Sequence, residues 1–441
     1  MEASIKKRPK AWIISVNMGY GHQRTAFPLR FLAPEGKVIN ANDYKGIPVR
    51  DRRIWKGTSK FYEMISNFKS FYLIGEFFFS FFNRFQKIIS FYPKKDSSDP
   101  SFQLKQIEKL IKTGWGAHLI DKLTFTKGNK YLPLISTFFT PAFMAEFLNY
   151  PGDIYCVICD ADIARPWASM RPSESRIKYF APNKRVVERL KLYGVKEKNI
   201  FLTGYPLPLE NISSNPTFGE LDILKNDLRY RLINLDPKET YRHQYNPLIR
   251  RYLTSLPFQP NHPLTLMFSV GGAGAQKEIA FKVVVALKNK LKENKIRIIL
   301  AVGIKEKVKY YFINNLNELG FNDQLGRNIE LISARDIETY FEKFNLALRK
   351  TDILWTKPSE LSFYAALGIP IIIAPPIGSQ EDFNLRWLEK SGFGIRQEDP
   401  NYTDQWLFDW LNQGYLAEAA MQCFIEGDKL GTYNIEEIIS K

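Results

Sequence analysis

The stretch TDILWTKPSELSFYAALGIPIIIAPPIGSQEDFN, from Thr351 to Asn384, decides the fold of this 441-residue chain. It predicts a buried strand that ends at Trp355, a turn at Lys357-Pro358-Ser359 and a short helix over Glu360 to Leu367. A second apolar strand, Ile369 to Ala374, then leads into a loop rich in proline and glycine. Two strands joined through a helix form a βαβ unit. Open α/β sheets bind ligands at the carboxyl ends of such strands, so this stretch also indicates a binding site.

Strands and helices alternate on both sides of a polar stretch, Pro208 to Pro263, which reads as a linker with an insertion. The expected strands are Ala11–Val16, Ile154–Cys159, Ile177–Ala181 and Asn199–Thr203 before it, and Leu264–Val270 and Ile296–Val302 after it. This pattern predicts an α/β fold with two Rossmann-like, doubly wound domains facing a cleft. The domains are expected over 1–207 and 264–400, and helices over 401–441 are expected to pack back toward the first domain.

The chain carries a formal net charge of +16 and has a pI near 9.4, which favours an anionic partner. No zinc-finger spacing, RNP-like strand or continuous basic helix accompanies the charge, so we do not expect nucleic acid. Three cysteines provide no disulfide framework. The amino terminus, MEASIKKRPK, lacks the apolar core of a signal peptide. A cytoplasmic location is therefore expected.

Two glycine-rich turns each follow a predicted strand and precede a predicted helix. The first is Gly19-Tyr20-Gly21-His22, and the second is Gly271-Gly272-Ala273-Gly274-Ala275-Gln276. Glycines let a ligand approach the backbone, and a helix amino terminus offers N–H groups to an anion such as a diphosphate. The structural alternatives are a plain strand-to-helix turn for the first and close packing of a helix on a sheet for the second.

Two carboxylates, Asp160 and Asp162, follow the strand Ile154–Cys159. A carboxylate at that place can orient a base or bind an acceptor hydroxyl, and it can equally cap the next helix. Cys156 and Cys159 spell C-x-x-C, but their odd separation on a strand predicts opposite faces. The histidines form no ligand spacing, and we expect no metal site.

These turns and the stretch around Lys357 resemble GT-B glycosyltransferases, in particular the MurG-type N-acetylglucosaminyltransferases and the diacylglycerol glycosyltransferases. GYGHQRTA is similar to the GxGHxxxA loop of the latter, which faces the acceptor. The resemblance implies that Gly19, Tyr20 and Gly21 form the acceptor-side loop, that His22 is the general base and that Asp160 assists it. A base with a pKa near neutrality suits that task.

The resemblance also implies a donor site in the second domain. GGAGAQ is similar to the GGSQGA-type turn that holds the diphosphate, and GSQEDFN to the GQExxN segment that binds the sugar. Phe363 stands where the family has a ribose-binding Glu. Glu360, three residues earlier, could reach the same space, and the alternative is that it only complements the helix dipole. The implied donor residues are Gly271, Gly272, Ala273, Gly274, Gln276, Lys357, Pro358, Ser359, Glu360, Gln380, Glu381 and Asn384.

Between Phe61 and Tyr92, 13 of 32 residues are Phe or Tyr, and lysines and arginines lie within and beside the segment. Charges interrupt the apolar run well before the ~18 residues that a membrane span needs. We therefore read 60–95 as an aromatic helical insertion that rests at a bilayer interface. The alternative is a pair of ordinary core helices.

The resemblance thus implies a hexosyltransferase that moves a sugar from a nucleotide-diphosphate donor to a lipid or lipid-linked hydroxyl, inverting and metal-independent. It needs no cofactor beyond the nucleotide sugar as co-substrate. It is expected to be peripherally bound to an anionic membrane surface. The alternatives are a nucleotide-sugar 2-epimerase and a non-catalytic or donor-divergent GT-B protein that acts as a membrane-docked partner.

Overall fold

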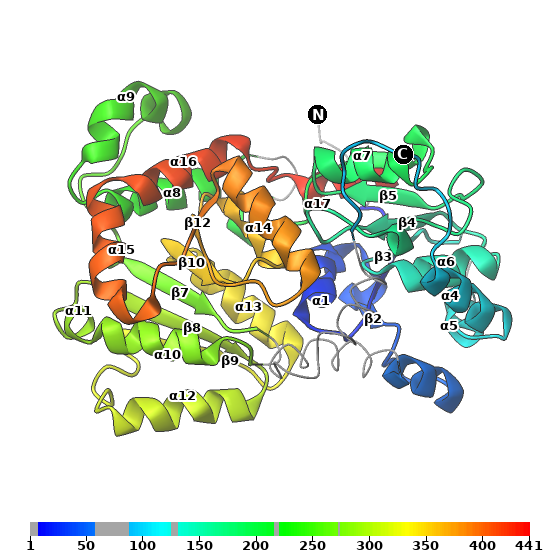
Figure 1. Ribbon diagram of the computed structural model, residues 1–441, viewed down its shortest axis with the longest axis horizontal. Coiled ribbons are helices and arrows are strands. Elements are labelled where there is room, and N and C mark those ends of the chain that lie inside the picture. The colour runs from blue at the N-terminus through cyan, green and yellow to red at the C-terminus, as the bar shows by residue number, and fades with distance from the viewer. Residues whose placement is uncertain (1–7, 58–87, 125–130, 216–219, 272–273) are drawn as a thin grey trace, which may run out of the picture. The chain divides into compact units, whose positions relative to one another are not determined.

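The computed structural model describes residues 8–57, 88–124, 131–215, 220–271 and 274–441. They form two compact units. The first comprises Met1–Leu207, Ile377–Phe383 and Leu430–Lys441, and the second comprises Pro208–Pro376 and Asn384–Lys429. Each unit is built on its own six-stranded sheet (Figure 1).

The first sheet is parallel throughout and has the order β2-β1-β3-β4-β5-β6. Its strands are β1 Trp12–Ser15, β2 Ile39–Asn40, β3 Leu134–Ser136, β4 Ile154–Val157, β5 Lys178–Ala181 and β6 Ile200–Leu202. Its α-helices are α1 Tyr20–Ala26, α4 Phe102–Lys112, α5 Ala117–Thr124, α6 Phe139–Phe147, α7 Lys184–Leu192 and α17 Gly431–Ile439. Short 3-10 turns are η1 Phe27–Leu32, η2 Pro34–Gly36, η3 Arg165–Trp167 and η4 Glu197–Asn199.

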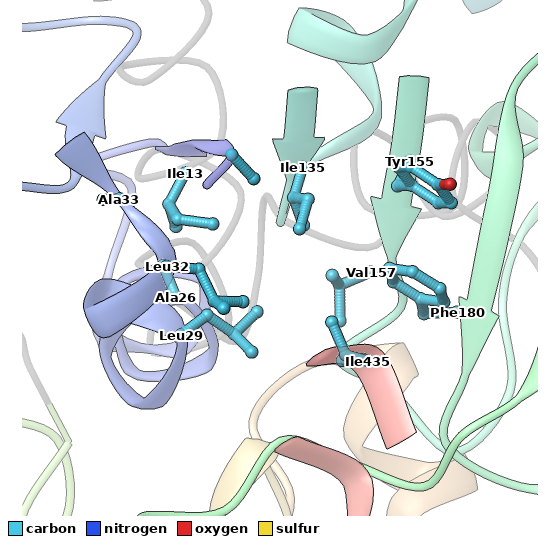
Figure 2. Packing of buried hydrophobic residues seen from close by; sticks show 11 residues of the cluster. Ile13, Ala26, Leu29, Leu32, Ala33, Ile135, Tyr155, Val157, Phe180 and Ile435 are labelled. Atoms are coloured by element: carbon cyan, nitrogen blue, oxygen red, sulfur yellow. The ribbon is translucent and has the colours of Figure 1, made fainter. Parts of the chain in front are cut away.

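Alternation along β1 places helices on both faces of this sheet. Ile13 is fully buried in a core cluster with residues of η1, β3, β4 and β5, and Ile435 of α17 belongs to the same cluster (Figure 2). Trp12, one residue earlier, points to the other face, where its indole Nε1 donates to the Leu123 carbonyl of α5 over 3.1 Å. β1 is therefore held on both faces of the sheet.

The second sheet is also parallel throughout, in the order β12-β11-β10-β7-β8-β9. Its strands are β7 Thr265–Ser269, β8 Arg297–Gly303, β9 Ile329–Ser333, β10 Ile353–Thr356, β11 Ile371–Ile373 and β12 Gly394–Arg396. The α-helices are α8 Asp222–Leu235, α9 Thr240–Leu253, α10 Lys277–Ala286, α11 Lys288–Lys292, α12 Glu306–Glu318, α13 Ile337–Leu348, α14 Ser379–Ser391, α15 Thr403–Asn412 and α16 Tyr415–Glu426. The 3-10 turns are η5 Leu209–Asn211, η6 Glu360–Leu367 and η7 Pro400–Tyr402.

The βαβ unit predicted from Thr351–Asn384 is present, with shorter strands and a 3-10 helix in place of an α-helix. η6 spans Glu360–Leu367 and stops at Gly368, whose φ of +67° favours glycine. A side chain at Gly368 would also meet Leu228 of α8 at 3.1 Å. The two domains of the predicted α/β, doubly wound fold are confirmed by the two parallel sheets.

Residues 208–263, expected to be a linker with an insertion, instead contain the two 14-residue helices α8 and α9 and belong to the second unit. Leu224, Leu228 and Leu232 of α8 are at most 1% exposed. Burial of a leucine side chain contributes about 1.5–3 kcal/mol, so α8 is part of the core. Polar residues between these leucines hide their helical spacing in the sequence.

The carboxy-terminal segment is divided between the two units. Of residues 401–441, expected to pack on the first domain, only Leu430–Lys441 belong to the first unit, where Thr432 donates to the Leu207 carbonyl over 2.6 Å. α15 and α16 belong to the second unit.

Most of the aromatic insertion predicted over 60–95 lies outside the described residues, which resume at Ile88. Within the described part of the chain, no helix is long and apolar enough to cross a membrane.

Candidate functional site

Each sheet has one place where the strand order reverses direction. In the first unit the chain runs from β1 to β2 on one side and then to β3 on the other, and in the second unit β7 is flanked by β8 and β10 in the same manner. Ligands of doubly wound sheets bind outside the carboxyl ends of strands at this switch point. The two glycine-rich turns of the sequence follow β1 and β7, so both lie at switch points.

His22 lies in the first turn of α1, directly after β1. Its ring Nδ1 is 2.8 Å from the backbone oxygen of Thr137, the residue that follows β3. The Thr137 hydroxyl in turn donates to the His22 carbonyl over 2.9 Å. These two contacts join both sides of the switch point and fix the orientation of the imidazole.

The contact with Thr137 also determines the tautomer of His22. A carbonyl oxygen only accepts hydrogen bonds, so Nδ1 carries the proton and Nε2 the lone pair. Loss of water around the ring lowers the pKa of His22 to about 4, against the opposing effect of the Thr137 carbonyl. The ring lies 4.8 Å from that of Phe138, centroid to centroid. The imidazole is therefore neutral at pH 7, and no described residue hydrogen-bonds to Nε2.

The loop after β4 approaches His22 through a residue that the sequence analysis did not place there. The Cys159 sulfur is 3.5 Å from His22 Nδ1, and Asp160, the next residue, is half-buried. Thr137 and Cys159 were missed as neighbours of His22. For Cys159 a signal was available, because it ends the predicted strand Ile154–Cys159 and parallel strands end at one edge of a sheet. No strand was predicted that ends at Thr137, so the sequence offered no such signal for it.

Asp162 has a structural role. Its carboxylate forms a two-point ion pair with the Arg189 guanidinium of α7, both contacts being 2.8 Å, and both side chains are buried. Of the two aspartates considered from sequence, Asp160 thus remains the candidate for the site.

In the second unit, the turn after β7 is closed by a hydrogen bond of 2.6 Å from the Gly274 amide to the Gly271 carbonyl. Gly274 has a φ of +82°, and a Cβ there would lie 2.9 Å from a methyl group of Val308. Glycine is thus required at this position. Gly272 and Ala273 lie outside the described residues. The turn leads into α10, whose amino terminus offers N–H groups to an anion.

Gln276, which ends this turn, is committed to the neighbouring loop. Its amide nitrogen donates to the Pro375 carbonyl, after β11, over 2.6 Å. Its side-chain oxygen is buried without a partner among the described residues. Gln276 thus holds the β7 and β11 loops together.

The loop after β10 lies beside the glycine turn. A Cβ on Gly271 would be 3.5 Å from Cε of Lys357, so the Lys357 chain passes along the turn. The loop is braced by Asn384 of α14, which is fully buried and donates to the Pro358 carbonyl over 3.2 Å. Ser359 precedes η6 and Glu360 begins it, where a carboxylate complements the helix dipole.

Phe363, which occupies the position expected for a ribose-binding Glu, is a core residue. It is 4% exposed and packs against the Trp387 ring of α14 at 4.9 Å between centroids. Its ring therefore fills the space between η6 and α14.

Gln380 and Glu381 belong to the first unit, which includes Ile377–Phe383, whereas the loops after β7 and β10 belong to the second. The Glu381 carboxylate accepts hydrogen bonds from the Ile377 amide at 2.6 Å and, more weakly, from the Gly378 amide at 3.4 Å, and so caps α14. Gln380 is half-buried in the first turn of α14.

In the described part of the chain, no group of three or more His, Cys, Asp or Glu side chains is arranged to hold a metal ion. The groups at the second switch point that can hold an anion are the backbone amides at the amino terminus of α10 and the Lys357 ammonium.

Two doubly wound, parallel α/β domains in one chain, each with a glycine-rich turn at its switch point, fit the two-domain α/β architecture of the GT-B fold class. A family described as a domain of unknown function (DUF6938) matches residues 257–327. No curated protein matches the sequence.

Among solved structures, Acinetobacter baumannii MurG is 12% identical, with a TM-score of 0.47, and the alignment covers 98% of this chain and 99% of that one. UDP-GlcNAc 2-epimerase from Neisseria meningitidis, bound to UDP-GlcNAc, is 14% identical, with a TM-score of 0.42, over 78% of this chain and 82% of that one. A glycosyltransferase from Rickettsia africae is 16% identical, with a TM-score of 0.36, over 78% and 83%.

Proposed function

We propose that this protein is a glycosyltransferase that moves a sugar from a nucleotide diphosphate to a hydroxyl group. The observation that carries the proposal is His22, a neutral imidazole at the first switch point whose Nδ1 is tied to Thr137 and whose Nε2 lone pair is available. A base in this state can take a proton from an alcohol at the moment the alcohol attacks.

The reaction that these residues support is a direct displacement. The acceptor oxygen forms a bond to the anomeric carbon of the donor as the bond from that carbon to the diphosphate breaks, and the acceptor proton moves to His22 Nε2. A single displacement inverts the anomeric centre. The departing diphosphate gains negative charge, which the amino terminus of α10 and the Lys357 ammonium can stabilise. We propose that these groups replace a metal ion.

The proposed acceptor is a lipid or lipid-linked hydroxyl, reached from an anionic membrane surface. The described residues beside the aromatic segment support this, because an exposed basic group lies there. Two carboxylates lie among these residues: Asp51 is buried and accepts a hydrogen bond from the Gly116 amide over 3.1 Å, and Asp43 is exposed and pairs with Arg52 over 3.9 Å. Five basic residues against these two carboxylates leave residues 43–56 with a surplus of positive charge. The group, called the basic face below, consists of Lys45, Arg50, Arg52, Arg53 and Lys56.

The test is a panel of nucleotide diphosphates and their sugars, first by thermal shift and then by transfer to lipid hydroxyls. A ligand at ~100 Kd stabilises the folded state by about 2.7 kcal/mol, which a thermal shift detects. His22→Gln should bind the same nucleotide sugar but transfer its sugar about 10²–10⁴-fold more slowly. His118→Gln, an exposed histidine of the same unit, is the control. Equal transfer rates for His22→Gln and wild type would remove His22 from the mechanism.

One observation favours a second candidate, a GT-B protein with an altered donor site that acts as a binding partner. Phe363 is buried against Trp387 and provides no oxygen for a ribose hydroxyl. Failure of every nucleotide sugar to stabilise the protein, with membrane binding retained, would support this candidate over the transferase.

A further inference from the structure

The second unit contains a pocket of about 440 Å³ that the proposed reaction does not use. It lies along α15 and the loop after β12, at the edge of the sheet, with β11 between β12 and the switch-point strand β10. Its walls are aromatic and acidic. The side chains that matter here, called the α15 pocket, are Tyr402, Trp406, Trp410, Glu398, Asp399 and Asp409.

The aromatic wall is fixed by a ladder of rings that begins in the core. Trp355 of β10 is fully buried and lies 5.3 Å from Trp406, centroid to centroid, and Trp406 lies 4.6 Å from Trp410. The Trp406 indole N–H donates to the Asp399 carbonyl over 2.9 Å. The rings are thus held in position before any ligand arrives, which reduces the entropy lost on binding.

The acidic wall is unusual in a chain whose net charge is +16. Three carboxylates line the pocket, and neither lysine nor arginine does. Asp399 accepts hydrogen bonds from the amide and side chain of Asn401 at 2.9 and 2.8 Å, which fixes the loop. Glu398 and Asp409 form no ion pair or side-chain hydrogen bond with any described residue. Their charge is therefore available to a ligand.

We propose that the α15 pocket binds an organic ammonium group, either of a free amine or quaternary ammonium compound or of a zwitterionic lipid headgroup. Aromatic faces attract a cation through their quadrupole, and carboxylates add Coulomb attraction. A neutral sugar would use the rings but would leave three carboxylates without a counter-charge. Charge thus decides between the two ligand classes.

This site is independent of the proposed transferase reaction, since it shares none of its residues. The pocket is nevertheless linked to the second switch point through η7. η7, which carries Tyr402, packs against α10, the helix that follows the glycine turn. An ammonium ligand in the pocket would thus contact η7, which packs against α10, and α10 follows the turn assigned to the diphosphate.

The experiment titrates the full-length protein with choline and ethanolamine and follows tryptophan fluorescence and heat of binding. The matched ligand is 3,3-dimethyl-1-butanol, which has the shape of choline without its charge. We expect saturable binding of the cations and about tenfold or more weaker binding of the neutral compound. Vesicles with choline or ethanolamine headgroups distinguish a lipid source from a free one.

Two variants test the two walls separately. Trp410→Ala should weaken choline binding about tenfold, and Asp409→Asn should weaken it several-fold and reduce its salt dependence. Asp404→Asn on the same helix does not line the pocket and should leave affinity unchanged. If Trp410→Ala fails to fold, Asp409→Asn still decides. Equal affinity for choline and its neutral analogue, saturation by neutral sugars alone, or no binding at all would overturn the proposal, whatever the outcome for nucleotides.

Discussion

At the scale of single residues, the environment of His22 makes a prediction that does not require the substrate. The pKa of His22 is lowered from 6.5 to about 4 by burial. Between these two values the unfolded chain binds more protons than the folded one, so folding stability rises with pH there. The contribution is complete above the unfolded value and is lost as the pH falls through the folded value.

We therefore expect the free energy of unfolding of the wild type to fall more steeply than that of His22→Gln as the pH is lowered from 6.5 to 4. Denaturant titrations across this range measure both slopes. The proposed activity should persist down to about pH 4, because above the folded-state pKa of His22 most of the protein carries the imidazole in its neutral, basic form. Parallel stability curves for the two proteins would show that the ring is as hydrated when folded as when unfolded.

The same scale shows what the sequence could predict of the site. The sequence places His22 and Lys357 after predicted strands and the family resemblance implies their roles; the structure has both residues at switch points. The contact of His22 with Thr137 spans 115 positions of the chain and depends on strand order, which local patterns do not contain. The capping of α14 by Glu381 was likewise hidden, because a carboxylate in the first turn of a helix can serve as a cap or as a ligand.

At the scale of elements, Arg231 explains why α8 belongs to the second unit. Its guanidinium is 2% exposed and donates to carbonyl oxygens of Thr351, Leu367 and Gly368 at 2.8, 3.0 and 3.2 Å. One side chain thus satisfies the end of η6 and the turn that precedes β10. An arginine in a polar stretch reads as a surface residue, so local sequence patterns do not indicate that this helix belongs to the core.

Arg231→Met should therefore lower the free energy of unfolding by about 3 kcal/mol or more, since several buried carbonyls lose their only charged donor. Arg229→Met on the same helix is the matched control, because Arg229 bonds to the Ser255 carbonyl near the surface. Urea denaturation of both variants gives the comparison. Similar losses would mean that solvent replaces the Arg231 contacts.

The proposed function assigns the diphosphate to Lys357 in the loop after β10, and the family resemblance assigns the sugar to Gln380 after β11, so two variants can test the two assignments separately. Lys357→Ala should weaken both a bare nucleotide diphosphate and its sugar conjugate, because both carry the negative charge of the diphosphate. Gln380→Ala should weaken only the conjugate if Gln380 contacts the sugar. Calorimetric titration of both ligands tests this, and Glu381→Gln reports separately on capping of α14. Equal losses for both ligands in Gln380→Ala would exclude a role for Gln380 in reading the sugar.

At the scale of the whole molecule, the two parallel sheets followed from sequence because buried strands and glycine turns repeat in both halves. The domain boundary was less predictable. Leu207 and Pro208 separate the units, and the chain crosses between them again at Ile377, Asn384 and Leu430. Such crossings arise from tertiary packing, and no composition change marks them in the sequence.

The chain's charge makes the last prediction. Arg52, Arg53 and Lys56 of the basic face are exposed, and each basic residue near an anionic bilayer contributes about 1 kcal/mol, an effect that fades within a Debye length. Reversing all three to Glu should abolish most co-sedimentation with anionic vesicles. Reversing Lys292, Lys305 and Lys307, which are exposed in the second unit, changes the net charge equally and is the control. Unequal losses would locate the contact on the basic face, whereas equal losses would show that only net charge matters.

Replacing Phe78, Phe79 and Phe82 with Ser then measures the apolar contribution to membrane binding. A loss of binding that persists at low salt cannot come from screening of charge.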